Sequence, residues 1–126
     1  EECWKLETKQ DDFLESMAEA DKSVVDYFKP ENMVYINVAN NISIDCDCDN
    51  NPKEPEIADI GIFASIDPVA LDKAWLDLIY NSNCDGKDKL IDRIETRNGG
   101  YIIDASLDLG FGSKEYELIN IDNESL

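Results

Sequence analysis

The fold is decided by the stretch Ile57-Ala58-Asp59-Ile60-Gly61-Ile62-Phe63-Ala64-Ser65-Ile66-Asp67-Pro68-Val69-Ala70-Leu71, in which one type of secondary structure gives way to another. Residues 57–65 are mostly apolar and predict a strand, in which Gly61 lets another group approach the backbone closely. Asp67 can cap the free amides of a helix, and Pro68 fits the first helical turn. The stretch therefore predicts a strand that leads into a helix.

Two elements are predicted before this stretch. Residues 11–29 predict an amphipathic helix that ends before Pro30, because the residue before a proline is pushed out of helical backbone angles. Residues 33–39 predict a buried strand that leads toward residues 45–49. The apolar stripe of the helix recurs at spacings of three and four, at Phe13, Met17, Ala20, Val24 and Phe28, with Leu14 and Val25 widening it.

Three elements are predicted after the stretch. A short apolar pattern that follows a loop at residues 81–89 predicts a helix near residues 90–94. Residues 101–109 carry both strand and helix signals, and we predict a helix because Gly110 gives a helix end signal. Residues 116–121 alternate in a manner that predicts a third strand.

These elements predict the α/β (α+β) class, with a small mixed β-sheet of about three strands covered by helices. With 126 residues the chain is expected to form a single domain, residues 1–126, with residues 1–10 and 123–126 loosely ordered. The sequence does not begin with methionine, and we expect it to be the C-terminal fragment of a longer chain.

Composition excludes several function classes. There are 29 acidic residues against 11 basic ones, and the net charge of -18 repels nucleic acids and anionic membrane surfaces. The chain has no histidine, so catalytic triads that depend on an imidazole base are excluded. No apolar run is long enough to span a membrane, and no signal peptide is recognisable, so we expect a cytoplasmic protein with reduced cysteines.

The most site-like segment is Asp45-Cys46-Asp47-Cys48-Asp49. In an extended chain Cys46 and Cys48 share one face, while the three aspartates share the other. The thiolates suit zinc, copper(I) or an iron–sulfur cluster, whereas the carboxylates suit calcium, magnesium or manganese. A disulfide between Cys46 and Cys48 is disfavoured by its geometry, so these two cysteines are candidate metal ligands.

Alternatives to this interpretation stay open. Asp45, Asp47, Asp49 and Glu56 fit the first, third, fifth and twelfth ligand positions of an EF-hand loop, although the preceding residues predict a strand instead of a helix. The cysteines can also be ordinary buried thiols at a strand end.

Other residues extend the list of candidates. Cys84 is the best candidate for a third sulfur ligand, although a plain free thiol fits as well. Cys3 can be a distant ligand, but we interpret it as an ordinary residue near the chain end. Asp67 and Asp72, with Asp47 or Asp59, can line a pocket of an enzyme fragment, because neighbouring acids acquire separated pKa values and can divide acid and base roles. For Asp67 the cap of a helix is an equally sufficient explanation.

Several segments occur in an order that resembles the carboxy-terminal region of the domain-of-unknown-function family 362. The resemblance covers most of residues 4–121. Its segments are Tyr35-Ile36-Asn37, Asp45-Cys46-Asp47-Cys48, Asp59-Ile60-Gly61-Ile62-Phe63-Ala64-Ser65, Asp67-Pro68-Val69-Ala70-Leu71-Asp72, Leu109-Gly110-Phe111-Gly112 and Glu115-Tyr116-Glu117-Leu118.

The resemblance implies a link to iron–sulfur or redox chemistry, since many members carry a ferredoxin-like domain before this region. It implies Cys46 and Cys48 as site residues, with Asp47, Asp59, Asp67 and Asp72 as nearby acids. We therefore expect a metal or iron–sulfur module, with Cys84 or a cysteine of another domain completing the site. The expected partner is a ferredoxin-like domain of the same parent chain or a redox protein. The alternative is a structural domain that docks this neighbour.

Overall fold

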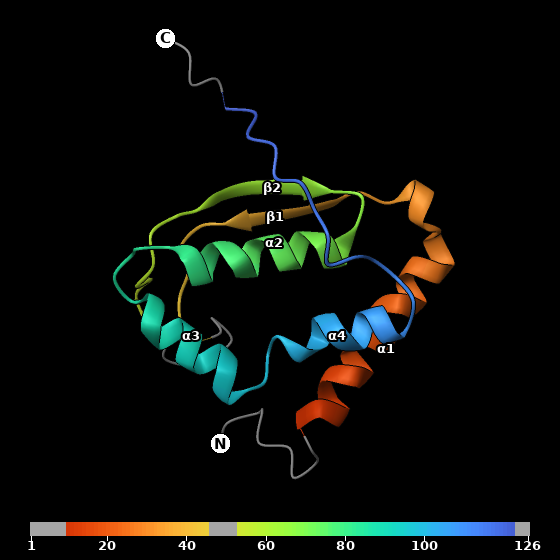
Figure 1. Cartoon of the computed structure of the whole chain (residues 1–126), viewed down its shortest axis with the longest axis horizontal. Helices are drawn as coiled ribbons and strands as arrows, with labels where there is room; N and C mark the ends of the chain where they lie inside the picture. Colours follow the sequence, from red (N-terminus) through yellow and green to blue (C-terminus); the bar gives the residue numbers. More distant parts are fainter. Residues whose placement is uncertain (1–9, 46–52, 123–126) are drawn as a thin grey trace.

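The computed structural model describes residues 10–45 and 53–122, which form helices on one side of a small sheet (Figure 1). The expectations for residues 1–9 and 123–126 lie outside the described residues. The elements, in chain order, are α1 (Gln10–Phe28), η1 (Pro30–Asn32), β1 (Tyr35–Ala39), β2 (Gly61–Ser65), α2 (Pro68–Asn81), α3 (Lys87–Thr96) and α4 (Tyr101–Asp108).

The sheet has two strands within the described residues. β1 and β2 pair in antiparallel fashion, with Tyr35 opposite Ser65 and Ala39 opposite Gly61. The α+β class is thus confirmed, whereas the prediction of a mixed sheet of about three strands is wrong for this part of the chain.

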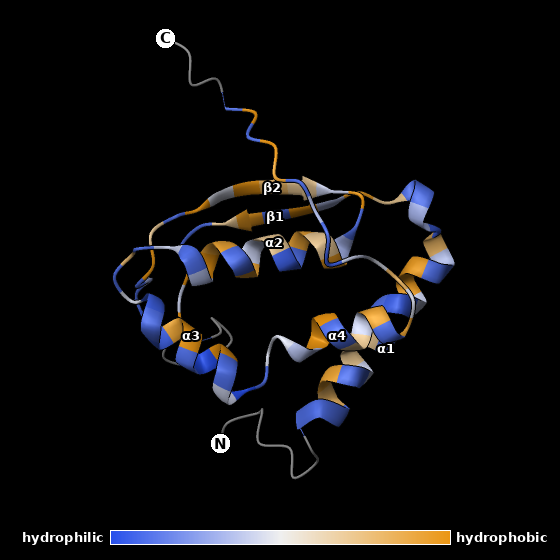
Figure 2. Cartoon of the chain, viewed as in Figure 1, coloured by the Kyte–Doolittle hydropathy of each residue, from blue (hydrophilic) through white to orange (hydrophobic). Residues whose placement is uncertain are grey.

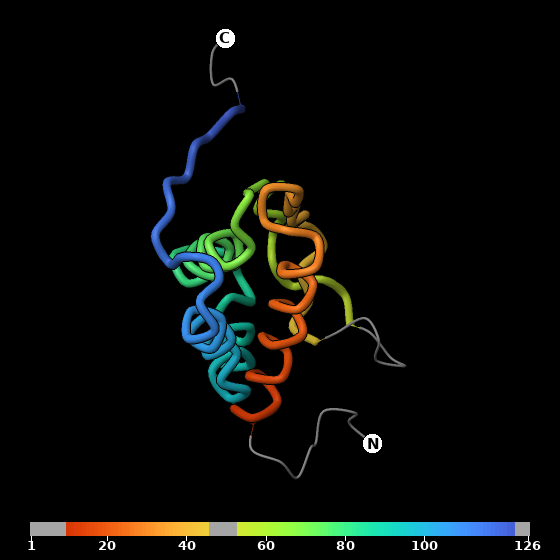
Figure 3. The backbone as a smooth tube through the Cα atoms, turned by 90° about the vertical axis from the view of Figure 1, so that its right-hand side faces the viewer, coloured from red at the N-terminus to blue at the C-terminus, as the bar shows by residue number. Residues whose placement is uncertain are grey.

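The predicted third strand at residues 116–121 is not a strand. The hydroxyl of Tyr116 donates a hydrogen bond to Oδ2 of Asp77 on α2, at 2.9 Å. In Figure 3 the tail and the two strands lie on opposite sides of α2. The segment is therefore held away from both edges of the sheet, and its alternating pattern has no strand with which to pair.

Both strands start later than predicted. Residues 33 and 34 follow the 3-10 turn η1, and β1 begins at Tyr35. β2 begins at Gly61, because Ile57 makes only an isolated bridge with Ile42. Gly61 has φ = 146°, a backbone angle that side chains with a Cβ rarely adopt.

The predicted first helix is confirmed as α1, but its buried face is rotated. The buried residues are Leu14, Ala18 and Val25, while Met17 and Val24 from the predicted stripe are exposed. The reason is that α1 packs against α4, which the apolar pattern of α1 alone does not position. Hydrogen bonds from Asn98 to Asp11 and from Tyr101 to Glu15 hold the same two segments together.

α2 is the central element, and the prediction of its start is confirmed. Oδ1 of Asp67 accepts a hydrogen bond from the amide of Ala70 at 3.0 Å, and Pro68 occupies the first turn. The helix packs against both strands and also against α3 and α4. The helices predicted near residues 90–94 and 101–109 are confirmed as α3 and α4.

Two apolar clusters form the core. The first, here called the α4 cluster, consists of the buried residues Val25, Val69, Ile103 and Phe111. The second, the α3 cluster, consists of Ile57, Ile79 and Leu90, with Ile42 and Cys84 among the residues packed against it.

The outer face of the sheet is apolar and uncovered by any described residue (Figure 2). Ile36, Val38 and Ile62 on this face are 67%, 54% and 73% exposed. Neither strand contains a charged residue, although charged residues make up 32% of the chain. No helix among the described residues is both long and apolar enough to cross a membrane.

Candidate functional site

The loop that carries the Cys-Asp-Cys motif is closed at its base by backbone contacts. Ile42 and Ile57 form an antiparallel bridge, and the carbonyl oxygen of Ile42 accepts hydrogen bonds from the amides of Glu56 (3.2 Å) and Ile57 (3.3 Å). The candidate ligands in residues 46–49, namely Cys46, Asp47, Cys48 and Asp49, lie outside the described residues. What the structure describes is therefore the frame from which this loop projects.

Helix α3 holds both ends of the loop through ion pairs. Nη2 of Arg93 lies 2.8 Å from Oδ1 of Asp45, and Nζ of Lys89 pairs with the carboxylate of Glu56. Lys89 and Arg93 are four residues apart, so they lie on one face of α3. Two of the four acids in the calcium-type pattern are thus bound by cations of the protein itself.

Cys84 lies at the base of the same loop. It is half-buried, packs against the α3 cluster, and its thiol donates a hydrogen bond to Oγ of Ser82 at 3.1 Å. The following turn is in close contact with the loop, because a Cβ added to Gly86 would lie 2.6 Å from the carbonyl oxygen of Glu56. The fold therefore brings the third candidate thiol to the segment that closes the Cys-Asp-Cys loop.

Asp59 and Asp67 have local structural contacts at opposite ends of β2. Oδ1 of Asp59 accepts a hydrogen bond from the amide of Asn41 at 2.9 Å, where the chain leaves β1. Asp67 caps α2. The five residues of β2 between them span about 16 Å at ~3.3 Å per residue, so these two acids do not share one pocket.

Asp72 lies on α2 and lines two adjoining cavities beside β1. Although part of this carboxyl remains exposed, desolvation raises its pKa above the usual value, and the charge of Asp21 on α1 raises that pKa further. Asp21 was not singled out by sequence analysis. No signal in the sequence pointed to Asp21, because it lies seven residues before the end of the predicted stripe, on a helix whose packing partner was unknown.

The described residues alone do not form a metal site. Among residues 10–45 and 53–122, no three cysteine, aspartate or glutamate side chains are arranged to hold a metal ion. Cys84 is the one thiol in these ranges. A thiolate site thus fits this chain only if cysteines outside these ranges, of which Cys46 and Cys48 are the predicted ones, supply further ligands, because a metal of this type takes four.

The cations of α3 are functional candidates that sequence analysis missed. Lys87 donates a hydrogen bond to the carbonyl oxygen of Ser82 at 2.8 Å, and Lys89 and Arg93 bind the loop. A signal was present, since three of the eleven basic residues fall within seven positions of a strongly acidic chain.

Comparison with known proteins identifies the family. The model of the family described as Domain of unknown function (DUF362) matches residues 2–77, which is more than half of the chain. No curated protein matches the sequence, and no solved structure matches it either. By this match, the chain belongs to the DUF362 family.

Proposed function

We propose that this protein is a metal- or iron–sulfur-associated, redox-linked module whose ligands are the thiolates of Cys46, Cys48 and Cys84. The observation that carries the proposal is the position of Cys84, which packs against the α3 cluster, the same cluster that holds Ile57 and Ile42 of the closed base of the Cys-Asp-Cys loop. Thiolates are ligands for zinc, copper(I) and iron–sulfur clusters, so the metal belongs to this group.

The charges around the loop favour thiolate ligands over the calcium alternative. Asp45 and Glu56 would be the first and last ligands of a calcium loop, and both form ion pairs with α3. These ion pairs disfavour a calcium site, because they engage two of its four carboxylate ligands.

The chain would supply three of the four ligands that such a centre takes. The fourth would come from a ferredoxin-like domain of the same parent chain or from a redox partner protein. This agrees with the resemblance, which implies that this region follows a ferredoxin-like domain in many family members. When bound, an iron–sulfur cluster supplies one-electron transfer, whereas zinc would supply only structure.

The second candidate function is a docking domain for that neighbour. It is favoured by the apolar, uncharged outer face of the sheet at Ile36, Val38 and Ile62, since contiguous apolar surface commonly marks an interaction site. This function requires no metal in the described chain.

The test is the metal and acid-labile sulfide content of protein purified without oxygen. Wild type, Cys46→Ser/Cys48→Ser, Cys84→Ser and the matched control Cys3→Ser are compared, with absorption spectra recorded alongside. We expect metal in the wild type and in Cys3→Ser, loss in the double variant and reduced content in Cys84→Ser. Equal content in all four proteins contradicts thiolate ligation, and metal-free proteins of equal stability leave docking as the function.

A further inference from the structure

A groove runs along the edge of β1 that no described strand pairs with, here called the free edge. Two cavities of about 560 Å³ and about 320 Å³ adjoin each other there and share Asn37, Val38 and Asp72 in their walls. The larger cavity is lined by every residue from 33 to 38. Because successive side chains of a strand point to opposite faces, consecutive residues can line one cavity only along the edge of the strand. The opposite edge of β1 is paired with β2.

The groove is bounded by helices that do not close it. α2 forms the floor with Leu71 and Asp72, while Val24 and Val25 of α1 stand opposite the strand. α1 packs on α4, and the cavity lies between α1 and β1, since residues of both elements line it. A free strand edge offers unpaired backbone amides and carbonyls, which an extended peptide can satisfy by adding a strand.

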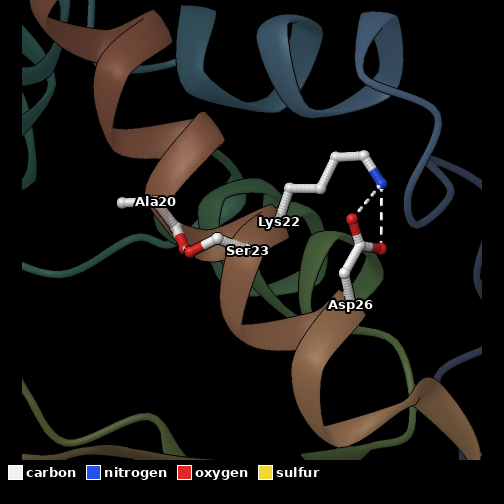
Figure 4. A network of polar contacts seen from close by, with 4 residues as sticks. All are labelled: Ala20, Lys22, Ser23 and Asp26. Carbon is white, nitrogen blue, oxygen red and sulfur yellow. Dashed lines mark hydrogen bonds and ion pairs between the residues drawn. The ribbon is translucent and has the colours of Figure 1, made fainter.

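Two carboxylates give the groove its charge. Asp21 from α1 and Asp72 from α2 both line the larger cavity, and no described lysine or arginine pairs with either of them. The nearest basic residues along the chain are engaged elsewhere, since Lys22 binds Asp26 (Figure 4) and Lys73 binds Asp77. Burial raises the pKa of Asp21, and its charge contributes to the raised pKa of Asp72, so a cation between them would relieve an unfavourable arrangement.

We infer that this groove binds an extended, basic peptide segment of a partner protein, which adds to the free edge of β1 as a third strand and places a lysine or arginine between Asp21 and Asp72. Its apolar side chains would pack on Val24 and Leu71. A second copy of this chain is a poor occupant. Its own unpaired segment at residues 116–121 is flanked by Glu115 and Asp122, and each copy carries a net charge of -18.

The test begins with selection of a random-peptide display library on the purified chain. We expect the selected peptides to alternate apolar residues with a lysine or arginine, and a synthetic peptide of this kind to shift the NMR amide signals of residues 35–39. Methylation of the backbone nitrogens of that peptide should abolish binding, because an added strand needs its amides.

The charge requirement is tested with two double variants. Asp21→Asn/Asp72→Asn should weaken binding of the selected peptide about fivefold, as expected for partly solvated ion pairs. The matched control Glu19→Gln/Asp88→Asn removes the same charge from exposed positions outside the groove and should leave affinity within about twofold. Circular dichroism establishes that each variant is folded.

Four results would overturn the inference. The first two are selection of acidic peptides and NMR amide signal changes that map away from β1. The other two are undiminished binding of the methylated peptide and equal affinity of the selected peptide for the two double variants. Concentration-dependent dimerisation with shifts at residues 35–39 would identify a second copy as the occupant and would also overturn it. None of these outcomes depends on the metal content, so this inference and the proposed function fail separately.

Discussion

The α4 cluster and the α3 cluster lie toward opposite ends of α2 and hold different parts of the molecule. The α4 cluster joins α1, α2, α4 and Phe111, with no described cysteine packed against it. The α3 cluster joins α2 and α3 to Ile57 and contacts Cys84. The two clusters thus have different roles. A substitution in either cluster should lower stability, but only one in the α3 cluster should also disturb the surroundings of Cys84.

The largest expected effect comes from truncation within the two clusters. Ile79→Ala removes a fully buried side chain from the α3 cluster and should lower the free energy of unfolding by about 4 kcal/mol. Ile103→Ala in the α4 cluster should cost about 3 kcal/mol. Chemical denaturation measures both values. Under native conditions only Ile79→Ala should speed alkylation of Cys84, and peptide mass mapping measures this rate. Equal acceleration in both variants would show that the two clusters do not have separate roles.

The contact between the loop and the α3 turn can be isolated with two glycines. Gly86 (φ = 84°) and Gly110 (φ = 77°) share a left-handed backbone, but only at Gly86 would a Cβ meet another atom, the Glu56 carbonyl oxygen. Gly110→Ala should cost about 1 kcal/mol from backbone strain alone. Gly86→Ala should cost about 3 kcal/mol, because a steric clash is added. Thermal and denaturant unfolding measure both losses of stability. Similar losses for the two variants would show that the loop is not in close contact with this turn.

The contact between α1 and α4 should stabilise the protein in a way that depends on pH in the alkaline range. The hydroxyl of Tyr101 donates to Glu15 at 2.7 Å, and this hydrogen bond, with nearby acids, raises the pKa of Tyr101 to about 12. Since the folded pKa lies above the ordinary value of 10, the stabilisation is complete below pH 10 and is lost as the pH rises toward 12. Tyr101→Phe should therefore lower the Tm modestly at pH 8, and the difference from wild type should shrink above pH 10.

The control for this prediction is Tyr27→Phe, at an exposed tyrosine on α1 that contacts Phe28. Its difference from wild type should stay constant over the same pH range. A constant difference for Tyr101→Phe as well would rule out the linkage.

The smallest expected effect is at the ion pairs of α3. Arg93→Gln should change the free energy of unfolding by less than about 1 kcal/mol, because the pair with Asp45 is partly exposed. Lys22→Gln, which removes the α1 pair shown in Figure 4, should have an effect of the same size. Only Arg93→Gln is expected to speed amide hydrogen exchange near Asp45. Unchanged exchange there would mean that α3 does not hold the end of the loop.

Local signals in the sequence predicted the elements but not their partners. Asp67 and Pro68 predicted the start of α2 because capping depends only on neighbouring residues. The alternation at residues 116–121 wrongly predicted a strand, because pairing needs a free edge nearby and Tyr116 is held by Asp77 instead. For the same reason the buried face of α1 was misplaced, since it depends on where α4 lies.

For the candidate site too, the sequence predicted the chemistry of single residues but not the contacts between them. The sequence identified Cys84 as a candidate thiol, but its packing against the α3 cluster depends on contacts between residues far apart in the chain. Lys89 and Arg93 were overlooked because a basic helix face is usually solvated and gains significance only from the carboxylates it meets. The roles of Cys46 and Cys48 stay a prediction.

The most direct measurement is a cobalt(II) titration of the oxygen-free protein, in which thiolate-to-cobalt charge-transfer absorption reports how many sulfurs bind the metal. We predict a saturable band that falls by about a third in Cys84→Ser, as expected when three thiolates become two, and that is unchanged in Cys3→Ser. Identical bands in wild type and Cys84→Ser would contradict the assignment of Cys84 as the third ligand, and absence of the band in the wild type would contradict thiolate ligation altogether.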